Sequence, residues 1–233
     1  MQDSRLPIAT GAAILALTAS GSSQGSEIIP ELLPFIGQVT GEFHQIPLER
    51  RRVLEGAASS LRAKLREEKP AEITFICTHN SRRSHLGQVW AQAAAAYYGL
   101  SGVRTYSGGT EATACNERTV AALIRAGLRI TNSTPEDTNP VYLVTYSEAA
   151  EPMRVFSKIY SAEANPAAGF VAAMTCDHAD ESCPFIFGSA LRISIPYVDP
   201  KASDGTAEEA ATYDERCREI AREMFYLMKQ VSL

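Results

Sequence analysis

The chain has 233 residues, of which 45% are hydrophobic and 21% are charged, a composition typical of a globular protein with one substantial core. Its 22 basic and 27 acidic residues give a net charge of −5, which argues against a protein that binds nucleic acid or anionic lipid. The 5 cysteines are too few for a disulfide scaffold, and their odd number leaves at least one unpaired in a monomer. The cysteines are therefore candidates for chemistry.

The amino-terminal stretch allows two interpretations. Residues 6–19 are apolar, and residues 20–26 are rich in serine and glycine, as linkers are. A cleavable secretory signal over residues 1–20 is one interpretation, but Asp3 and Pro7 break its usual pattern, and the apolar run is too short to span a membrane as a helix. We favour the other interpretation, an ordinary apolar helix or a poorly ordered arm, on a protein that forms no stable association with membranes.

Residues 27–70 carry a helical pattern. Apolar side chains recur every three or four residues, and Pro47 is suited to begin the second of two helices. We expect this extension to pack on the main domain, residues 71–233, or to form a dimer surface. The expected organisation is thus an apolar and linker segment over residues 1–26, the helical extension, and the main domain.

The main domain alternates between strand and helix patterns. In chain order we expect a strand at 72–77, a helix at 84–98, a strand at 102–106, a helix from Asn116 to Gly127, strands at 170–175 and 192–196, and a helix at 207–229. This order predicts an α/β fold with a parallel central sheet, helices on both faces, and functional loops at the carboxyl ends of the strands. Two further strand-like runs, 141–146 and 155–160, predict a β-hairpin inserted at about residues 140–162.

The loop after the first expected strand gives the strongest functional signal. We call residues 77–84 the nucleophile loop, and its sequence is Cys77-Thr78-His79-Asn80-Ser81-Arg82-Arg83-Ser84. A loop that turns its backbone N–H groups inward and ends at a helix amino terminus binds a tetrahedral oxyanion. We therefore expect residues 78–84 to form an oxyanion site.

Four side chains of the nucleophile loop have expected roles. Cys77 would be a thiolate nucleophile directed at the central atom of the anion. Arg83 can hold two anion oxygens through its planar fork, and Ser84 can donate a hydrogen bond to the sulfur. Asn80 suits a left-handed backbone position in the bend. A buried structural cysteine beside a solvated arginine pair is the alternative, but the order of strand, loop and helix favours the functional interpretation.

This Cys-x5-Arg-Ser loop resembles that of the low-molecular-weight protein tyrosine phosphatase superfamily, and the resemblance covers about residues 72–230. It implies the corresponding α/β fold and a general acid, an aspartate followed by proline late in the chain. Asp199-Pro200 is the matching pair, and Asp199 would protonate the leaving oxygen as the thiolate attacks. Two features depart from the family: Arg82, which adds positive charge where cysteine is frequent, and residues 201–203, which replace aromatic residues that contact phosphotyrosine.

A second pair of thiols, Cys176 and Cys183, lies seven positions apart at the end of another expected strand. On a helix this spacing puts both thiols on one face but about 10 Å apart, so a disulfide between them requires the helix to unwind. Such a pair suits a redox relay with a nearby nucleophilic cysteine. Two alternatives remain. The cysteines could bind zinc together with the Asp, His and Glu residues between them, or they could have a purely structural role.

This pair is similar to one in the thioredoxin-coupled arsenate reductases, which share the phosphatase fold. The resemblance implies that Cys77, assisted by Arg83 and Asp199, attacks arsenate. Cys176 then attacks Cys77 and releases arsenite, and Cys183 takes over the disulfide, which thioredoxin reduces. The resemblance implies no metal ion and no other cofactor. A relay that needs a reducing partner favours a cytoplasmic location over an oxidising compartment.

The other two cysteines have no role in this relay. Cys115 lies just before a helix, where a thiol can be activated, but it resembles a family position held by an apolar residue. Cys217 lies near the apolar face of the last expected helix. We expect both to be structural. The pair Gly108-Gly109 lacks the spacing of a dinucleotide-binding fingerprint.

Three functions remain as hypotheses at this point. Arsenate reduction by a thiol relay leads, and hydrolysis of phosphotyrosine or another phosphate monoester through a phosphocysteine at Cys77 is the alternative. Both begin with the same attack on a tetrahedral anion. The third is a module that binds an oxyanion or a metal without turnover.

Overall fold

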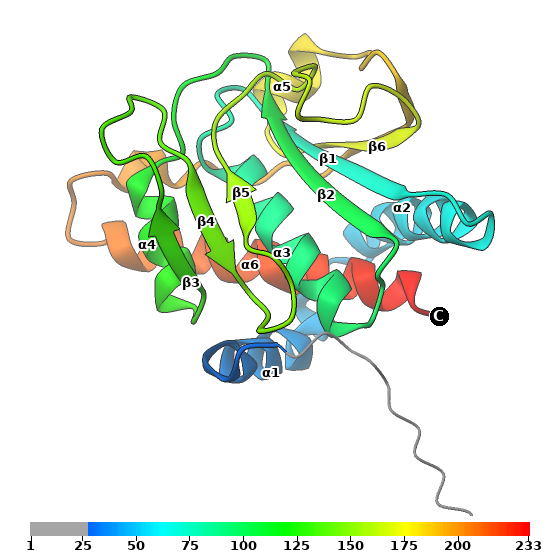
Figure 1. The fold of residues 1–233 in the computed structure, drawn as a ribbon, viewed down its shortest axis with the longest axis horizontal. Helices are drawn as coiled ribbons and strands as arrows, with labels where there is room; N and C mark the ends of the chain where they lie inside the picture. Colours follow the sequence, from blue (N-terminus) through cyan, green and yellow to red (C-terminus); the bar gives the residue numbers. More distant parts are fainter. Residues whose placement is uncertain (1–27) are drawn as a thin grey trace, which may run out of the picture.

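The computed structural model describes residues 28–233, so the expectations for residues 1–26 lie outside the described part of the chain. The elements, shown in Figure 1, are η1 (Pro30–Leu32), α1 (Leu33–Gly41), η2 (Phe43–Gln45), α2 (Leu48–Arg66), β1 (Ala71–Cys77), α3 (Arg83–Tyr97), β2 (Val103–Gly109), α4 (Glu117–Arg125), β3 (Arg129–Asn132), β4 (Tyr142–Thr145), β5 (Met153–Val155), β6 (Phe170–Met174), α5 (Asp177–Ser182), β7 (Ser189–Ser194), η3 (Pro200–Ser203) and α6 (Glu209–Val231).

The central sheet is parallel, with strand order β2-β1-β6-β7. Side chains of β1 are buried on both faces: Ile73 and Phe75 enter the larger hydrophobic cluster, and Ile76 enters a smaller one. Helix α3 packs along β1 and β2 with Gly87 directly against the Phe75 ring, where no larger residue fits. Helix α6 packs against α2 and α3, and α5 covers the opposite face beside β1 and β6. The predicted α/β fold with both faces covered is confirmed.

The second sheet differs from the predicted hairpin. Strands β4 and β5 pair antiparallel as expected, but β3 adds a third strand on the other side of β4. The predicted second strand, 155–160, is wrong, because β5 ends at Val155. Residues 156–160 leave this sheet and run beside the nucleophile loop, and Ile159 forms a parallel bridge with Gly109. The sequence of β3 is short and half polar, so its strand character depends on pairing with β4 rather than on a local pattern.

The helical extension packs on the main domain. Its helices α1 and α2 lie against α6, as Figure 1 shows, and their buried residues Ile36, Leu54 and Leu61 belong to the larger hydrophobic cluster. The backbone N–H of Ile29 donates to the carbonyl of Tyr146 at 3.2 Å, which ties the start of the extension to the end of β4. The extension and the main domain therefore share one core.

The parallel sheet determines where functional groups meet. The carboxyl ends of β1, β6 and β7 lie at one edge of the sheet, and the segments that follow them are the nucleophile loop, α5 and the stretch containing Asp199. Residues separated by more than 100 positions in the sequence are thereby brought to one edge.

Candidate active site

The backbone of the nucleophile loop is held from outside. The carbonyls of residues 78–81 accept hydrogen bonds, in that order, from Glu111 N (2.8 Å), Thr113 Oγ1 (3.0 Å), His85 Nε2 (2.6 Å) and Asn116 N (2.9 Å). Because a trans peptide directs its N–H opposite to its carbonyl, outward carbonyls turn the N–H groups of residues 79–82 inward. The loop thus presents a row of N–H groups that suits a tetrahedral oxyanion.

Asn80 fixes the bend of this loop. Its φ of 44° lies in the left-handed region, as predicted from the residue type. Its Nδ2 donates to Ser84 Oγ at 2.8 Å, and its Oδ1 accepts from the backbone N–H of Lys158 at 2.8 Å. The segment 156–160, which leaves the second sheet, therefore supports the nucleophile loop from the side.

His85 is a neutral donor behind the bend. It is fully buried, and burial together with the nearby charge of Lys158 lowers the pKa of His85 to about 3. A neutral imidazole carries one hydrogen, and the partner of Nε2 is the carbonyl of Asn80, which can only accept. The hydrogen therefore resides on Nε2, and His85 donates it to the loop backbone.

Cys77 lies at the end of β1, where only 3% of it is exposed. Its Sγ is 3.0 Å from Ser84 Oγ. Since the Ser84 oxygen already accepts a hydrogen bond from Asn80, its own hydrogen is free to point at the sulfur. This hydrogen bond and the amino terminus of α3 both stabilise negative charge on Cys77.

Arg83 and Asp199 form an ion pair at the edge of the loop. Arg83 Nη2 donates to Asp199 Oδ2 at 2.8 Å, and its Nη1 donates to the carbonyl of Tyr197 at 2.9 Å. Arg83 Nε is buried and, among the described residues, has no hydrogen-bond partner. Asp199 also accepts from Lys201 N at 3.1 Å and begins η3. Two of the predicted site residues are thus in direct contact.

Two other loop side chains point elsewhere. Arg82 Nε donates to the hydroxyl of Tyr213 at 3.0 Å, and its guanidinium lies 3.9 Å from Asp199 and 3.8 Å from Asp204. The positive charge expected from Arg82 is therefore balanced by two carboxylates. The His79 side chain is half exposed, beside Glu111, so this residue offers the loop only its backbone.

The thiols of Cys176 and Cys183 flank α5. Cys176 caps its amino end, with Sγ 3.4 Å from Ala179 N and 3.5 Å from Thr78 Oγ1 in the nucleophile loop. Cys183 ends the helix and is partly exposed. Cys77 and Cys176 belong to the smaller hydrophobic cluster, and Cys183 packs against it. Three cysteines from distant parts of the sequence therefore gather around one small apolar core.

Arg192 on β7 clamps α5. Its guanidinium donates to the carbonyl of Cys183 (3.2 Å), to the carbonyl of Asp180 (2.7 Å) and to Asp180 Oδ1 (2.5 Å). Ser194 Oγ donates to the other carboxylate oxygen of Asp180 at 2.7 Å. These contacts hold the helical form of α5, in which the two thiols are at opposite ends.

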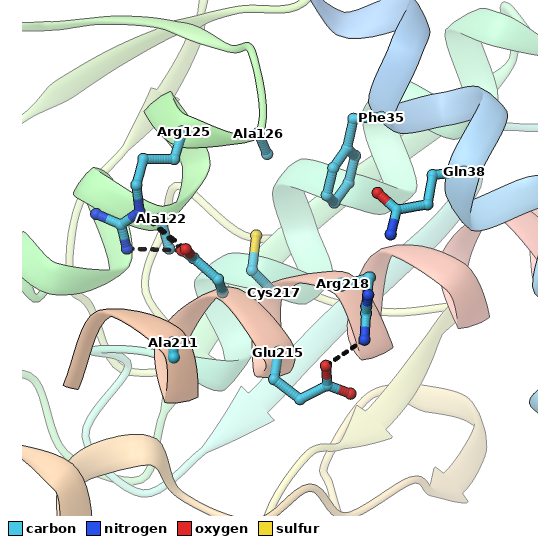
Figure 2. Close-up of a pocket in the computed structure, with 10 residues that line it drawn as sticks. Phe35, Gln38, Ala122, Arg125, Ala126, Ala211, Glu215, Cys217 and Arg218 are labelled. Carbon is cyan, nitrogen blue, oxygen red and sulfur yellow. Dashed lines mark hydrogen bonds and ion pairs between the residues drawn. The ribbon is translucent and has the colours of Figure 1, made fainter. Parts of the chain in front are cut away.

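Cys115 and Cys217 lie apart from this cluster, in the larger core. Burial raises the pKa of each thiol to about 12, which favours the structural role expected for both. Cys217 accepts a hydrogen bond from Trp90 Nε1 at 3.3 Å. It is one of the residues that line a pocket of about 400 Å³ between α1, α4 and α6 (Figure 2), where Arg125 is paired with Asp214.

Sequence reasoning missed the residues that hold the site in place. The backbone N–H of Lys158 supports the nucleophile loop from 78 positions away in the sequence. Arg192 holds α5 from 9 to 12 positions away, and Tyr197 contributes its carbonyl to Arg83. No local pattern marks a backbone donor or acceptor.

Metal-ligating side chains do not converge at this site. In residues 28–233, no three His, Cys, Asp or Glu side chains come close enough together to bind an ion. The helices of the same range also include none with both the length and the hydropathy of a membrane span.

In comparison with known proteins, residues 72–145 match the family model described as low molecular weight phosphotyrosine protein phosphatase. A curated arsenate reductase of Bacillus subtilis (strain 168) is 29% identical over 147 residues, which are 63% of this chain and 86% of that protein. These matches confirm the resemblance inferred from the nucleophile loop.

Solved structures of the same two kinds are also similar. A low molecular weight phosphotyrosine phosphatase from Vibrio cholerae O395 matches 68% of this chain and 95% of its own, with 13% identity and a TM-score of 0.46. A thioredoxin-dependent arsenate reductase from Corynebacterium glutamicum matches 83% of this chain and 96% of its own, with 16% identity and a TM-score of 0.35.

Proposed function

We propose that this chain, an enzyme related to the low-molecular-weight phosphotyrosine phosphatases and the arsenate reductases, reduces arsenate to arsenite with Cys77, Cys176 and Cys183. The observation that carries the proposal is the gathering of these three thiols around one apolar cluster, while the other two cysteines lie in the main core. A phosphatase needs only Cys77, so the two additional thiols favour reduction.

The first step is attack on arsenate. The anion is held by the inward N–H groups of the nucleophile loop and by Arg83, whose Nε donates to one of its oxygens. The Cys77 thiolate forms a bond to arsenic, and one arsenic–oxygen bond breaks. Asp199, as the general acid, donates a proton to the departing oxygen, which leaves as water. An anion that takes over part of the Arg83 fork loosens the pairing between Arg83 and Asp199, so the carboxyl group can turn to the leaving oxygen.

The second step transfers electrons. The Cys176 thiolate attacks Cys77 Sγ, forming a disulfide, and the pair of electrons of the sulfur–arsenic bond stays on arsenic, which leaves as arsenite. The contact between Cys176 Sγ and Thr78 Oγ1 at 3.5 Å supports this assignment, because it brings the attacking thiol to the nucleophile loop. Two thiols are oxidised and arsenic(V) becomes arsenic(III).

The third step regenerates the nucleophile. The Cys183 thiolate attacks Cys176 Sγ, and Cys77 leaves as a thiolate. This attack requires α5 to unwind, since the helix keeps the two thiols at its opposite ends. The resulting disulfide at residues 176 and 183 would be reduced by a dithiol protein of the thioredoxin type, which supports a cytoplasmic location.

Hydrolysis of a phosphate monoester is the second candidate function. The family match over residues 72–145 favours it, because those residues include the nucleophile loop but neither Cys176 nor Cys183. In this reaction water, not Cys176, would attack the adduct on Cys77.

The variant Cys183→Ser separates the two functions. On one preparation, arsenate turnover with thioredoxin and its reductase is measured beside hydrolysis of an aryl phosphate, with Cys115→Ala as the matched control. We expect Cys183→Ser to stop multiple-turnover reduction, to keep any hydrolysis, and to release about one arsenite per chain, because the first two steps need no Cys183. Efficient hydrolysis of aryl phosphate by the unmodified chain, without arsenite, would overturn the reductase proposal.

A further inference from the structure

The helical extension directs one partly buried arginine at the segment that follows β7 and at α6. Arg50, in the first turn of α2, is largely shielded from solvent, with 19% of its side chain exposed. Its Nη2 donates to the carbonyl of Pro196 at 2.8 Å, and its Nη1 donates to Glu223 Oε2 at 3.1 Å. The neighbouring Arg52 is 63% exposed and pairs with Glu49 one turn away. Arg50 therefore contacts residues outside its own helix, whereas the ion pair of Arg52 lies within α2.

Arg50 and α6 together enclose Tyr197. The guanidinium of Arg50 lies over the Tyr197 ring, 5.1 Å from its centre, and the Tyr197 hydroxyl donates to Glu223 Oε2 at 2.7 Å. Both Tyr197 and Glu223 are almost fully buried. The side chain of Tyr197 is thus fixed at both its ring face and its hydroxyl.

The backbone of the same tyrosine reaches the active site. The Tyr197 carbonyl accepts from Arg83 Nη1 at 2.9 Å, and Asp199, two residues further on, accepts from Arg83 Nη2 at 2.8 Å. The segment 196–199 therefore holds Arg83 by two adjacent groups. Any displacement of Tyr197 would move both the anion-binding fork and the carboxyl group of the expected general acid.

We propose that Arg50 is a positioning residue of this active site, through which the helical extension holds segment 196–199 and thereby orients Arg83 and Asp199. The inference rests on the proposed function for the roles of Arg83 and Asp199. Arg50 touches neither the nucleophile loop nor the substrate. It acts by fixing Pro196 and Tyr197 from behind, so that the fork of Arg83 and the Asp199 carboxyl group stand at a set distance from Cys77.

The test uses variants that keep the protein folded. Removing Arg50 alone leaves the buried Glu223 carboxylate without its cation, which is strongly destabilising. The double variant Arg50→Met/Glu223→Gln removes both charges and keeps a hydrogen-bond acceptor for Tyr197. Arg50→Lys keeps the charge but cannot bridge Pro196 and Glu223 in the same fork geometry. Arg52→Met is the matched control on the same helix.

Two measurements on the full chain report the position of Arg83 and of Asp199 separately. The first is the concentration of inorganic phosphate that protects Cys77 from iodoacetamide, which depends on Arg83 and needs no turnover. The second is the hydrolysis rate of aryl phosphates with good and poor leaving groups, because only poor leaving groups need a proton from Asp199. A purely structural role would leave both the phosphate affinity and the leaving-group dependence unchanged in a folded variant.

We expect the double variant to bind phosphate about tenfold more weakly and to lose about tenfold in rate on phenyl phosphate, a part of the 10² to 10⁴ that general acid catalysis supplies. Its rate on dinitrophenyl phosphate should fall only by the loss in binding. Arg50→Lys should be intermediate, and Arg52→Met should match the unmodified chain. A folded double variant with unchanged phosphate protection and leaving-group dependence would overturn the proposal. Failure of the unmodified chain to turn over arsenate or aryl phosphate would instead refute the proposed function. The protection of Cys77 by inorganic phosphate, measured across the same variants, would still decide the role of Arg50.

Discussion

Loss of the Arg192 clamp should make the relay disulfide easier to form. In the dithiol form Arg192 makes three hydrogen bonds to α5, to Cys183 O, Asp180 O and Asp180 Oδ1. The disulfide requires α5 to unwind, so these bonds favour the dithiol over the disulfide. Arg192→Met removes them, and the equilibrium should move toward the disulfide.

The size of this effect follows from the exposure of the pair. Arg192 and Asp180 are 23% and 27% exposed, so solvent reduces each bond to about 0.5 kcal/mol, and three bonds give about 1.5 kcal/mol. That is roughly a tenfold change in the equilibrium constant. For a two-electron couple it lowers the reduction potential by about 30 mV.

The assay is a titration with glutathione redox buffers in a Cys77→Ser background, followed by alkylation and mass measurement. Arg104→Met is the matched control, because Arg104 is an exposed arginine on β2, at the opposite edge of the central sheet. A potential that is unchanged in Arg192→Met, or that rises, would refute the reasoning that helical α5 opposes the disulfide.

Three further predictions concern the loop and the core. The pKa of His85 is about 3 in the folded chain and about 6.5 in the unfolded chain, so between these values only the unfolded chain binds this proton. The free energy of unfolding should therefore fall as the pH falls below about 6.5, by at most about 1.4 kcal/mol per pH unit. Urea titrations at several pH values should show a flatter acid limb in His85→Gln, and an identical limb would contradict the assignment. At neutral pH in the native protein, iodoacetamide should leave Cys115 and Cys217 unlabelled until denaturant is added, since burial raises both pKa values to about 12; mass mapping that finds early labelling would be contrary evidence. Gly109→Ala would press a methyl group against the backbone of the nucleophile loop, so phosphate protection of Cys77 should weaken at least about tenfold, and an unaltered protection curve would show that the loop tolerates the change.

The sequence was informative where a structure depends on neighbouring residues. The strand before Cys77, the left-handed bend at Asn80 and the cap of α4 were all predicted, and the Asn116 side chain does accept from Arg118 N at 3.0 Å. Each depends on a pattern or a residue preference spanning a few positions. The same is true of the glycine that ends α4, whose φ is +105°.

The supports of the site could not be predicted in this way. Arg50 and Pro196 are separated by 146 positions, and Asn80 and Lys158 by 78. Such contacts depend on how elements pack and leave no periodic signal in the sequence. Strand β3 was missed for a related reason, because its residues become a strand only by pairing with β4.

The most direct test of the account is a single turnover of arsenate by the reduced chain, without any reductant. After quenching with acid and alkylation, arsenite is counted and the disulfide is located by peptide mass. The account predicts about one arsenite per chain and a disulfide between Cys176 and Cys183, with Cys77 again a free thiol. No arsenite, or arsenite with Cys176 and Cys183 both still reduced, would contradict the relay.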